Sequence, residues 1–514
     1  MSRFLEGRAP EDVMAARAIA DRQYARGCSR ALPPRSSAGS FRSCYASVCL
    51  RWRMQRACDA MTMRRELPPL VGRRQMSTGT SDHTRHGRSG SRIDRDRSNV
   101  VRPTSRQRSM ARALAVVATV GERDRRRSGA ASLEIEHRFG FSEPFSIGVE
   151  EELFLVDPLT GQQRNSSAAV LERLGEVDGT VEQELHACEV ELITNIHTRA
   201  GDAALAVGAM RRAVLQTGTG LLASGTHPSA REGDAAITHK ERYERIHHLL
   251  GDAAVTPTAA LHVHVGMPDP ETAIRTFNGL RRELPLLQAL AANSPFRHGR
   301  DTGLASAREV SLRQWPRSGA PRAMRDYADF CQMTSALTRA ADVPDYTYFW
   351  WKLRPHPRLG TVEVRALDAQ TSLSHTAALV ALVQCLARDA AEAEPGVDPS
   401  PELIEEGIFR AARFGVHGRL PDAHGNLRPV SEILQDTLAR LQGRARELGC
   451  VQQLALLPDL WRRGGGAGVQ RAIYERAGIH AVTKQLTHVT AAEAAPEHRP
   501  TDASHSGQRP MIRG

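Results

Sequence analysis

The chain has few features of a secreted, zinc-binding or membrane protein. Its 514 residues include eight cysteines, and none of them forms a Cys-X-X-Cys pair or another zinc-binding spacing. A zinc module and a disulfide-stapled secreted fold are therefore excluded, and we expect reduced thiols in a cytoplasmic protein. No apolar run is long enough to span a bilayer, and the N-terminus lacks the apolar stretch and cleavage site of a signal peptide.

Lysine is absent from residues 1–138, which contain 29 arginines and 13 acidic residues. This segment carries a formal charge of +16, so the rest of the chain carries −5 of the total of +11. It is rich in Arg, Ser, Gly and Pro without sustained apolar periodicity, and we expect it to be disordered. An over-extended reading frame, with Met110 as the true start, explains the same composition. A nucleic-acid-binding arm is a third interpretation.

Residues 139–487 combine strand patterns that have polar faces with amphipathic helix patterns. This length can bury a substantial core, and the alternation indicates an α+β domain rather than a doubly wound sheet. Residues 488–514 are expected to form a flexible tail. The predicted strands are 145–156, 181–186, 188–194, 258–266 and 360–367, and the predicted helices are 200–216, 271–291, 375–393, 401–414, 429–448 and 468–478.

Two acidic strands indicate a metal site. Because side chains alternate along a strand, Glu150 and Glu152 share one face and Glu151 lies on the other. In the second strand, Glu189 and Glu191 share a face in the same way. Paired carboxylates repel each other unless a cation bridges them, and Mg²⁺ or Mn²⁺ prefers such oxygen ligands. For one pair alone, a solvated edge strand with surface acids is the alternative.

Two later strands carry imidazole and guanidinium groups. His262 and His264 lie on one face of an apolar strand, where such a pair near acids is typical of a metal or phosphate site. Glu363 and Arg365 also share a face. They form either a plain ion pair or a metal ligand beside a phosphate clamp, since arginine matches phosphate oxygens in a bidentate fashion.

An aromatic and basic segment precedes the last of these strands. The sequence Phe349-Trp-Trp-Lys352-Leu-Arg354 offers groups for a nucleotide or for the carboxylate of an amino acid. Packing in the core explains its aromatic residues equally well.

Seven motifs occur in a specific order along the chain. They are Gly148–Glu152, Glu184–Thr194, His262–Gly266, Asn293–Phe296, Thr302–Gly303, Ala305–Ser306 with Arg308, and Gly360–Arg365. This ordered set resembles the carboxylate–amine ligases called glutamate–cysteine ligase type 2, over about 141–487. The resemblance implies a fold related to glutamine synthetase, in which a curved, mostly antiparallel sheet forms a funnel with helices outside.

The resemblance also implies a reaction and its site residues. ATP and Mg²⁺, with Mn²⁺ as an alternative, would support a weak ligation of glutamate to cysteine through a γ-glutamyl phosphate, releasing ADP and phosphate. The matching metal ligands are Glu150, Glu152, Glu184, Glu191, His262 and Glu363. The matching catalytic residues are Glu363 and Arg365, and Arg365, Lys352 and Arg354 match the nucleotide-binding positions. The chain departs from the family's pattern at Arg297-His298 and Leu304, where aromatic residues are expected, and these departures concern the amine pocket.

Three other interpretations stay open. The ligase could use an amine other than cysteine. The pair His262 and His264, together with Asp368, also fits a metal-dependent amidohydrolase. The basic N-terminal segment fits a nucleic-acid-binding protein, which deletion of residues 1–138 would test. For the ligase we expect small-molecule substrates and neither a nucleic-acid nor a membrane partner, and a homodimer is compatible with it.

Overall fold

The computed structural model describes residues 135–494, with the exception of 255, 395 and 396. The predictions for residues 1–134, namely disorder, a start at Met110 and a nucleic-acid arm, lie outside the described residues. The same holds for the part of the predicted tail beyond residue 494.

A seven-stranded sheet forms the centre of the fold. The strand order is β2-β3-β1-β5-β9-β8, and β4 pairs with β1 off this path. Every pairing in the sheet is antiparallel, so the predicted α+β class with an antiparallel sheet is confirmed. The strands are β1 (Ile147–Val156), β2 (Thr180–Gln183), β3 (Glu189–Ile193), β4 (Gly220–Leu222), β5 (Ala260–Gly266), β8 (Leu353–His356) and β9 (Thr361–Asp368).

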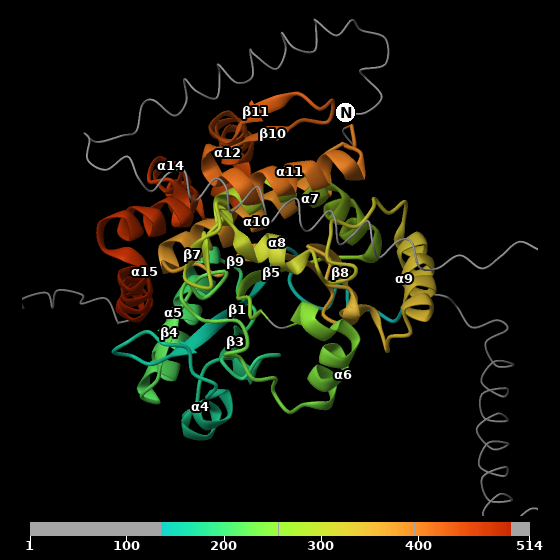
Figure 1. The fold of residues 1–514 in the computed structure, drawn as a ribbon. Coiled ribbons are helices and arrows are strands. Elements are labelled where there is room, and N and C mark those ends of the chain that lie inside the picture. Colours follow the sequence, from blue (N-terminus) through green and yellow to red (C-terminus); the bar gives the residue numbers. More distant parts are fainter. Residues whose placement is uncertain (1–134, 255, 395–396, 495–514) are drawn as a thin grey trace, which may run out of the picture. The chain divides into compact units, whose positions relative to one another are not determined.

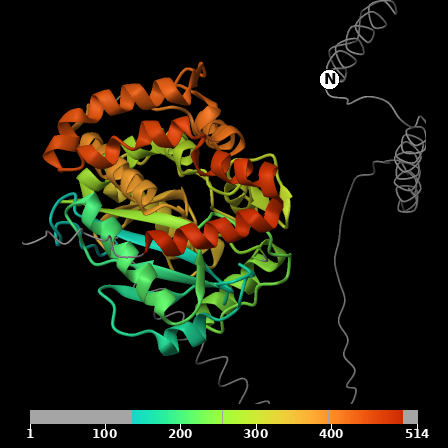
Figure 2. The ribbon, with the colours of Figure 1, turned by 90° about the vertical axis from the view of Figure 1, so that its left-hand side faces the viewer.

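Helices cover one face of this sheet. Helix α5 (Ala200–Gln216) packs on β1 and β3, and α7 (Pro270–Ala291) and α10 (Leu373–Glu392) pack on β9 and β5. A further layer over α7 and α10 consists of α11 (Pro401–Phe414) and α12 (Val430–Glu447), on the upper side of Figure 1. The view in Figure 2, turned by 90°, shows the same separation between the helical layers and the sheet.

The two faces of the sheet differ because the strands alternate apolar and polar side chains. Ile147 and Val149 of β1 join Val263 and Val265 of β5 in the main core against α7 and α10. The opposite face carries Glu150 and Glu152 of β1 and His262 and His264 of β5. This polar face stays accessible and is the floor of the candidate site.

The remaining elements connect or flank the sheet. The helices are α4 (Ser167–Arg173), α6 (Glu241–Leu250), α8 (Ala307–Leu312), α9 (Tyr327–Ala341), α13 (Val451–Leu454), α14 (Leu457–Arg462) and α15 (Gly465–Glu493). Two small sheets have two strands each: β6 (Phe296–Arg297) pairs with β7 (Arg300–Asp301), and β10 (Arg419–Pro421) pairs with β11 (Leu427–Pro429). Short 3₁₀ turns span Gly251–Ala254, Tyr346–Tyr348 and Gly415–His417.

For most of the long helices, the boundaries predicted from the sequence agree closely with those in the structure. Helix α5 begins and ends at the predicted residues, whereas α15 continues to Glu493, beyond the predicted domain end at 487. Residues 488–493 therefore belong to this helix and not to a tail. The sequence analysis did not predict α6, α8 and α9, of which α8 has only six residues.

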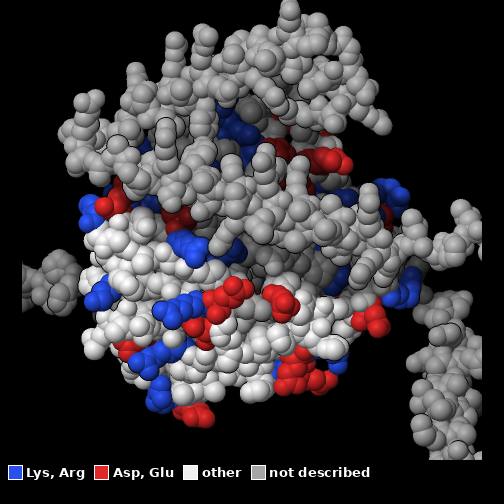
Figure 3. All heavy atoms as spheres, viewed as in Figure 1, with Lys and Arg blue, Asp and Glu red and all other residues white. Residues whose placement is uncertain are grey.

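Further expectations concern cysteines, membrane segments and surface charge. The cysteines within the described ranges are all buried, and no disulfide joins them to one another: Cys188, Cys331, Cys385 and Cys450. No helix in that part of the chain is both long and apolar enough to cross a membrane. On the face drawn in Figure 3, basic and acidic side chains of the described residues intermingle.

Candidate active site

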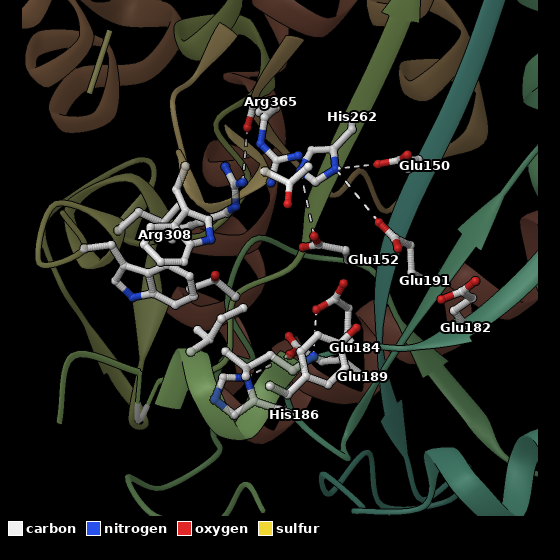
Figure 4. A pocket seen from close by; sticks show the side chains of 18 of the residues that line it. Glu150, Glu152, Glu182, Glu184, His186, Glu189, Glu191, His262, Arg308 and Arg365 are labelled. Carbon is white, nitrogen blue, oxygen red and sulfur yellow. Dashed lines mark hydrogen bonds and ion pairs between the residues drawn. The ribbon is translucent and has the colours of Figure 1, made fainter. Parts of the chain in front are cut away.

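A cavity of about 330 Å³ opens on the polar face of the sheet. Its walls come from β1, β3, β5, β8 and β9 and from the helices α6 and α8. This size fits a pocket for a small molecule. Figure 4 shows acidic side chains on one side of the cavity and guanidinium and aromatic groups on the other. The predicted residues that line it are Glu150, Glu152, Glu184, Glu191, His262, Lys352, Arg354 and Arg365.

Three groups of side chains have ligand atoms close enough to hold a metal ion. In each group the carboxylate oxygens and imidazole nitrogens lie within 4.8 Å of one another. The groups are Glu150–Glu191–His262, Glu150–His264–Glu363 and Glu152–Glu184–Glu191. Together they contain all six of the metal ligands that the resemblance implies and add His264, which the strand pattern had paired with His262 as a candidate metal or phosphate site.

His262 belongs to the first of these groups and also lies close to Glu152 of the third. Its Nδ1 is 3.0 Å from Oε2 of Glu150, and its Nε2 is 3.7 Å from Oε1 of Glu152. The pairing of β5 with β9 shifts register between Leu261 and Val263, which is a bulge in β9 where two residues, Arg365 and Ala366, stand opposite His262. Bulges commonly re-aim side chains beside active sites. Here the shift lets Arg365 line the pocket while Leu367, two residues on, packs in the core.

The carboxylates of the cluster have opposite electrostatic environments. Although burial opposes it, the charge of His264 and hydrogen bonds from both histidines hold the pKa of Glu150 well below its ordinary value. Burial and the charge of Glu184 raise the pKa of Glu152 to about 8. Burial and the charges of Glu150, Glu184 and Glu152 also raise the pKa of Glu191 well above its ordinary value.

These pKa shifts describe a cluster with too much negative charge for its own cations. Burial and the charge of Arg365 lower the pKa of His262 to about 4, so this imidazole is neutral at pH 7 and its nitrogens can coordinate a metal. Divalent cations would replace the protons on Glu152 and Glu191. An oxygen-rich set with one imidazole fits Mg²⁺ or Mn²⁺, so the residues present fit the expected ions.

Glu363 lies below this cluster and is paired with two guanidinium groups. Nε of Arg354 donates to its Oε2 at 2.5 Å, and Nη1 of Arg365 donates to its Oε1. Its side chain is completely buried. Although burial opposes it, Arg354 and Arg365 hold the pKa of Glu363 well below its ordinary value. Glu363 therefore orients Arg365 and lies 3.9 Å from His264 at the edge of one metal group.

The aromatic and basic segment divides between core and pocket. Phe349 and Trp351 pack in the main core, whereas Trp350 lines the cavity and meets Trp315 edge to face with ring centres 5.0 Å apart. Lys352 lines the pocket but its ammonium group is bound by the buried carboxylate of Glu309. Core packing therefore holds for Phe349 and Trp351, whereas binding of a nucleotide or a carboxylate by the residues that line the pocket stays a prediction.

Some lining residues escaped the sequence analysis. Helix α6 contributes Arg242, Tyr243 and Ile246, which no sequence pattern near the motifs indicated. Arg308 was part of a motif but received no role. The sequence does contain a signal for the helix that carries Arg308. Ser306 and Glu309, on either side of Arg308, form a helix-start pattern, and the Ser306 side chain accepts a hydrogen bond from the Glu309 amide.

Solved structures identify the class of fold. A glutamate–cysteine ligase of Francisella tularensis in complex with AMP superposes with a TM-score of 0.53 and 13% identity, covering 70% of this chain and 91% of that one. A bifunctional glutathione synthetase of Pasteurella multocida superposes with a TM-score of 0.51 and 15% identity, covering 68% of this chain and 52% of that one. The fold is therefore that of the glutamate–cysteine ligases.

The sequence defines the family more narrowly. The chain belongs to glutamate–cysteine ligase family 2, whose model matches residues 146–494. A provisionally named glutamate–cysteine ligase 2-3 of Rubrobacter xylanophilus is 40% identical over 366 residues, which is 70% of this chain and all of the relative. A provisionally named glutamate–cysteine ligase 2 of Gloeobacter violaceus is 34% identical over 345 residues, covering 64% of this chain and 92% of the relative. The predicted family is confirmed.

Proposed function

We propose that this chain is an ATP- and Mg²⁺-dependent ligase that joins the γ-carboxylate of glutamate to the amino group of cysteine. The observation that carries the proposal is the convergence of three carboxylate and imidazole groups near Arg365, two of which line one pocket while His264 and Glu363 of the other lie behind its lining. Family membership supports the same activity.

The reaction explains why the pocket needs both signs of charge. Joining a carboxylate to an amine in water is uphill, so ATP first phosphorylates the γ-carboxylate, and the amine then displaces phosphate from the γ-glutamyl phosphate. In phosphoryl transfer the protein mainly positions the reactants and neutralises charge. Divalent cations held by Glu150, Glu152, Glu191 and His262 would neutralise the phosphates and the acceptor carboxylate.

Arg365 has the clearest role among the protein's own groups. Its guanidinium is held by Glu363 and its side chain is 19% exposed, so it can reach a phosphoryl group in the pocket. Its pKa is raised, because Glu363 and Glu150 outweigh the opposing effect of burial, so it carries a full positive charge. Donors fixed in this way stabilise charge that develops in the transition state.

Glutamate-dependent phosphate release tests the proposal. The full chain is incubated with ATP, Mg²⁺, glutamate and a panel of amines that includes cysteine, and the products are identified by mass spectrometry. We expect phosphate release that requires glutamate and an amine and that stops with EDTA. Absence of glutamate-dependent release with every amine would contradict the activity, whereas a product with another amine would change only the acceptor.

The basic N-terminal segment provides a second test. All residues that line the pocket lie between Glu150 and Arg365, so deletion of residues 1–134 should leave phosphate release unchanged. The deletion stops there because the Ile135 carbonyl accepts a hydrogen bond from Tyr327 and the Arg138 amide donates to Pro357. A chain that works by binding nucleic acid would instead lose affinity and its salt dependence.

A further inference from the structure

Two cysteines from separate layers of the fold meet inside the main core. Cys385 lies in α10, and Cys450 follows the end of α12 and directly precedes α13. Their Sγ atoms are 3.3 Å apart, and both side chains are almost completely buried. Because an S–S bond is about 2.05 Å long, a movement of roughly 1 Å joins the two sulfurs.

Contacts on either side hold the two sulfurs opposite each other. Nε of Arg388, which follows Cys385 by one helical turn, donates to Oε1 of Glu447 at 2.7 Å. Glu447 in turn lies three residues before Cys450. The Cys450 amide donates to the carbonyl of Ala445 at 2.9 Å, which fixes the backbone at the end of α12. The approach of the sulfurs is therefore part of the packing of α10 against α12 and α13.

The two thiols differ in how readily they lose a proton. Hydrogen bonding with the thiol of Cys385 lowers the pKa of Cys450, although burial opposes it. The same hydrogen bond and burial raise the pKa of Cys385. The thiolate is the nucleophilic form of cysteine, so Cys450 is the sulfur that reacts first.

The turn that carries Cys450 lies close to the surface. Gly449 has a φ of +65°, and α13 has only four residues. Val451 is 51% exposed and, with Ala445 and Leu454, lines a groove of about 310 Å³. Short, exposed segments open locally at a smaller free energy than global unfolding requires. Opening of this turn would expose Cys450 while the sheet stays folded.

We propose that Cys385 and Cys450 form a redox modification site, at which a peroxide produces a reversible disulfide. The Cys450 thiolate attacks one peroxide oxygen, the O–O bond breaks, and the other oxygen leaves as water after it takes up a proton. The Cys385 thiol then attacks the sulfenic sulfur of Cys450, which forms the S–S bond and releases a second water. The two thiols thus lose two electrons and two protons, and one hydrogen peroxide becomes two waters. A dithiol reductant reverses the bond by thiol–disulfide exchange.

The disulfide would join α10 to the turn before α13, at positions 65 residues apart in the chain. A cross-link that closes a long loop stabilises the folded chain, chiefly by restricting the unfolded one. Neither cysteine lines the candidate active site, so the inference does not rest on the proposed function.

Peptide mapping after peroxide treatment tests the site. The full chain is treated with hydrogen peroxide, the remaining thiols are alkylated, and the unreduced chain is digested with trypsin. Cys385 and Cys450 then lie in the peptides 366–388 and 447–462, each of which contains a single cysteine. We expect these two peptides to appear cross-linked and to separate when dithiothreitol is added.

The rate of the reaction shows whether the turn opens locally. Cys188 and Cys331 are also buried and serve as internal references. Cys385 and Cys450 should become resistant to alkylation at least about tenfold faster than these references, because local opening requires less free energy than global unfolding.

Variants and stability provide matched controls. Cys450→Ala should abolish the cross-link, whereas Cys331→Ala, which removes another buried thiol, should retain it. The melting temperature of the wild-type chain should rise by a few degrees on oxidation and return with dithiothreitol, and Cys450→Ala should show no such reversible rise. Should a variant not fold, the peptide map of the wild-type chain decides by itself.

Three outcomes would overturn the inference. In the first, both cysteines stay open to alkylation after peroxide treatment. In the second, Cys450 pairs with a different cysteine or is oxidised to the sulfinic acid. In the third, the pair reacts no faster than Cys188 and Cys331, which would make its contact ordinary core packing. Each of these leaves the proposed function standing, since phosphate release tests that function separately.

Discussion

Glu151 and Arg211 form a completely buried, two-pronged ion pair directly beneath the candidate active site. Nε of Arg211 donates to Oε2 of Glu151 at 2.7 Å and Nη2 donates to Oε1 at 2.6 Å. Arg211 also donates to the backbone carbonyls of Gln370 and Thr371, which follow β9. The pair therefore ties α5 and β1 to the end of β9, and the neighbours of Glu151 in sequence project to the opposite face.

This arrangement predicts that adjacent glutamates have different roles. Glu151→Gln should lower the free energy of unfolding by about 3–5 kcal/mol, because it leaves the guanidinium of Arg211 buried without its counter-charge. Chemical denaturation measures the loss. Replacement of both partners by apolar residues should recover part of it, and a Glu151→Gln variant as stable as the wild-type chain would contradict the structural role.

Glu152→Gln should act on metal binding and not on the fold. The substitution removes a carboxylate that burial and Glu184 keep from ionising, so we expect unchanged or higher stability without metal. We also expect weaker Mg²⁺ binding, measured as a smaller rise in melting temperature with added Mg²⁺. An unchanged Mg²⁺ response would exclude Glu152 as a ligand.

The same carboxyl predicts a pH dependence of the metal-free protein. Because the folded state raises the pKa of Glu152 from 4.5 to about 8, its stabilising contribution is present at low pH and is lost as pH rises through about 8. In EDTA, the melting temperature of the wild-type chain should fall relative to that of Glu152→Gln as the pH rises from about 4.5 to about 8, the unfolded and folded pKa values. Mg²⁺ should reduce this difference, because it replaces the proton. A constant difference across that range would contradict the raised pKa.

Arg365→Gln should reduce turnover without unfolding the protein. Glu363 keeps its hydrogen bonds from Arg354, so no buried carboxylate is left unpaired. We expect the rate of phosphate release at saturating substrates to fall on the order of 10²–10³-fold, as for removal of a donor to transition-state charge. The melting temperature serves as the control, and a rate close to wild type would remove Arg365 from the reaction.

Lys352 and Glu309 predict a strong energetic coupling. Both side chains are buried and bound to each other, and Arg313 also donates to Glu309 at 3.2 Å, so Lys352→Met should cost about 1–3 kcal/mol by leaving one oxygen of Glu309 without its partner. A double-mutant cycle with Glu309→Gln should recover part of this loss. If Lys352 also binds the nucleotide, as the resemblance implies, Lys352→Met raises the KM for ATP as well. An additive cycle would show that the contact contributes little.

The amino-acid sequence alone was sufficient for the local geometry of this protein. The two-residue period of a strand placed Glu150 and Glu152 on one face and Glu151 on the other, and the structure agrees. The 3.6-residue period of a helix fixed α5 at both ends. The ordered motifs identified the family. Each of these features depends on residues close together in the chain, so local periodicity was enough.

Only the tertiary structure decided which of these residues meet. The bulge in β9 opposite His262 and the wall that α6 adds to the pocket each join segments distant in sequence. The pairing of Glu363 with Arg354 as well as Arg365 depends on the register of the neighbouring strands β8 and β9. The buried carboxylate of Asp368 is satisfied by Asn293 and Ser294 from one distant segment and by Ser306 from another. Such choices follow from long-range packing and from the need to pair buried polar groups, which no local pattern encodes.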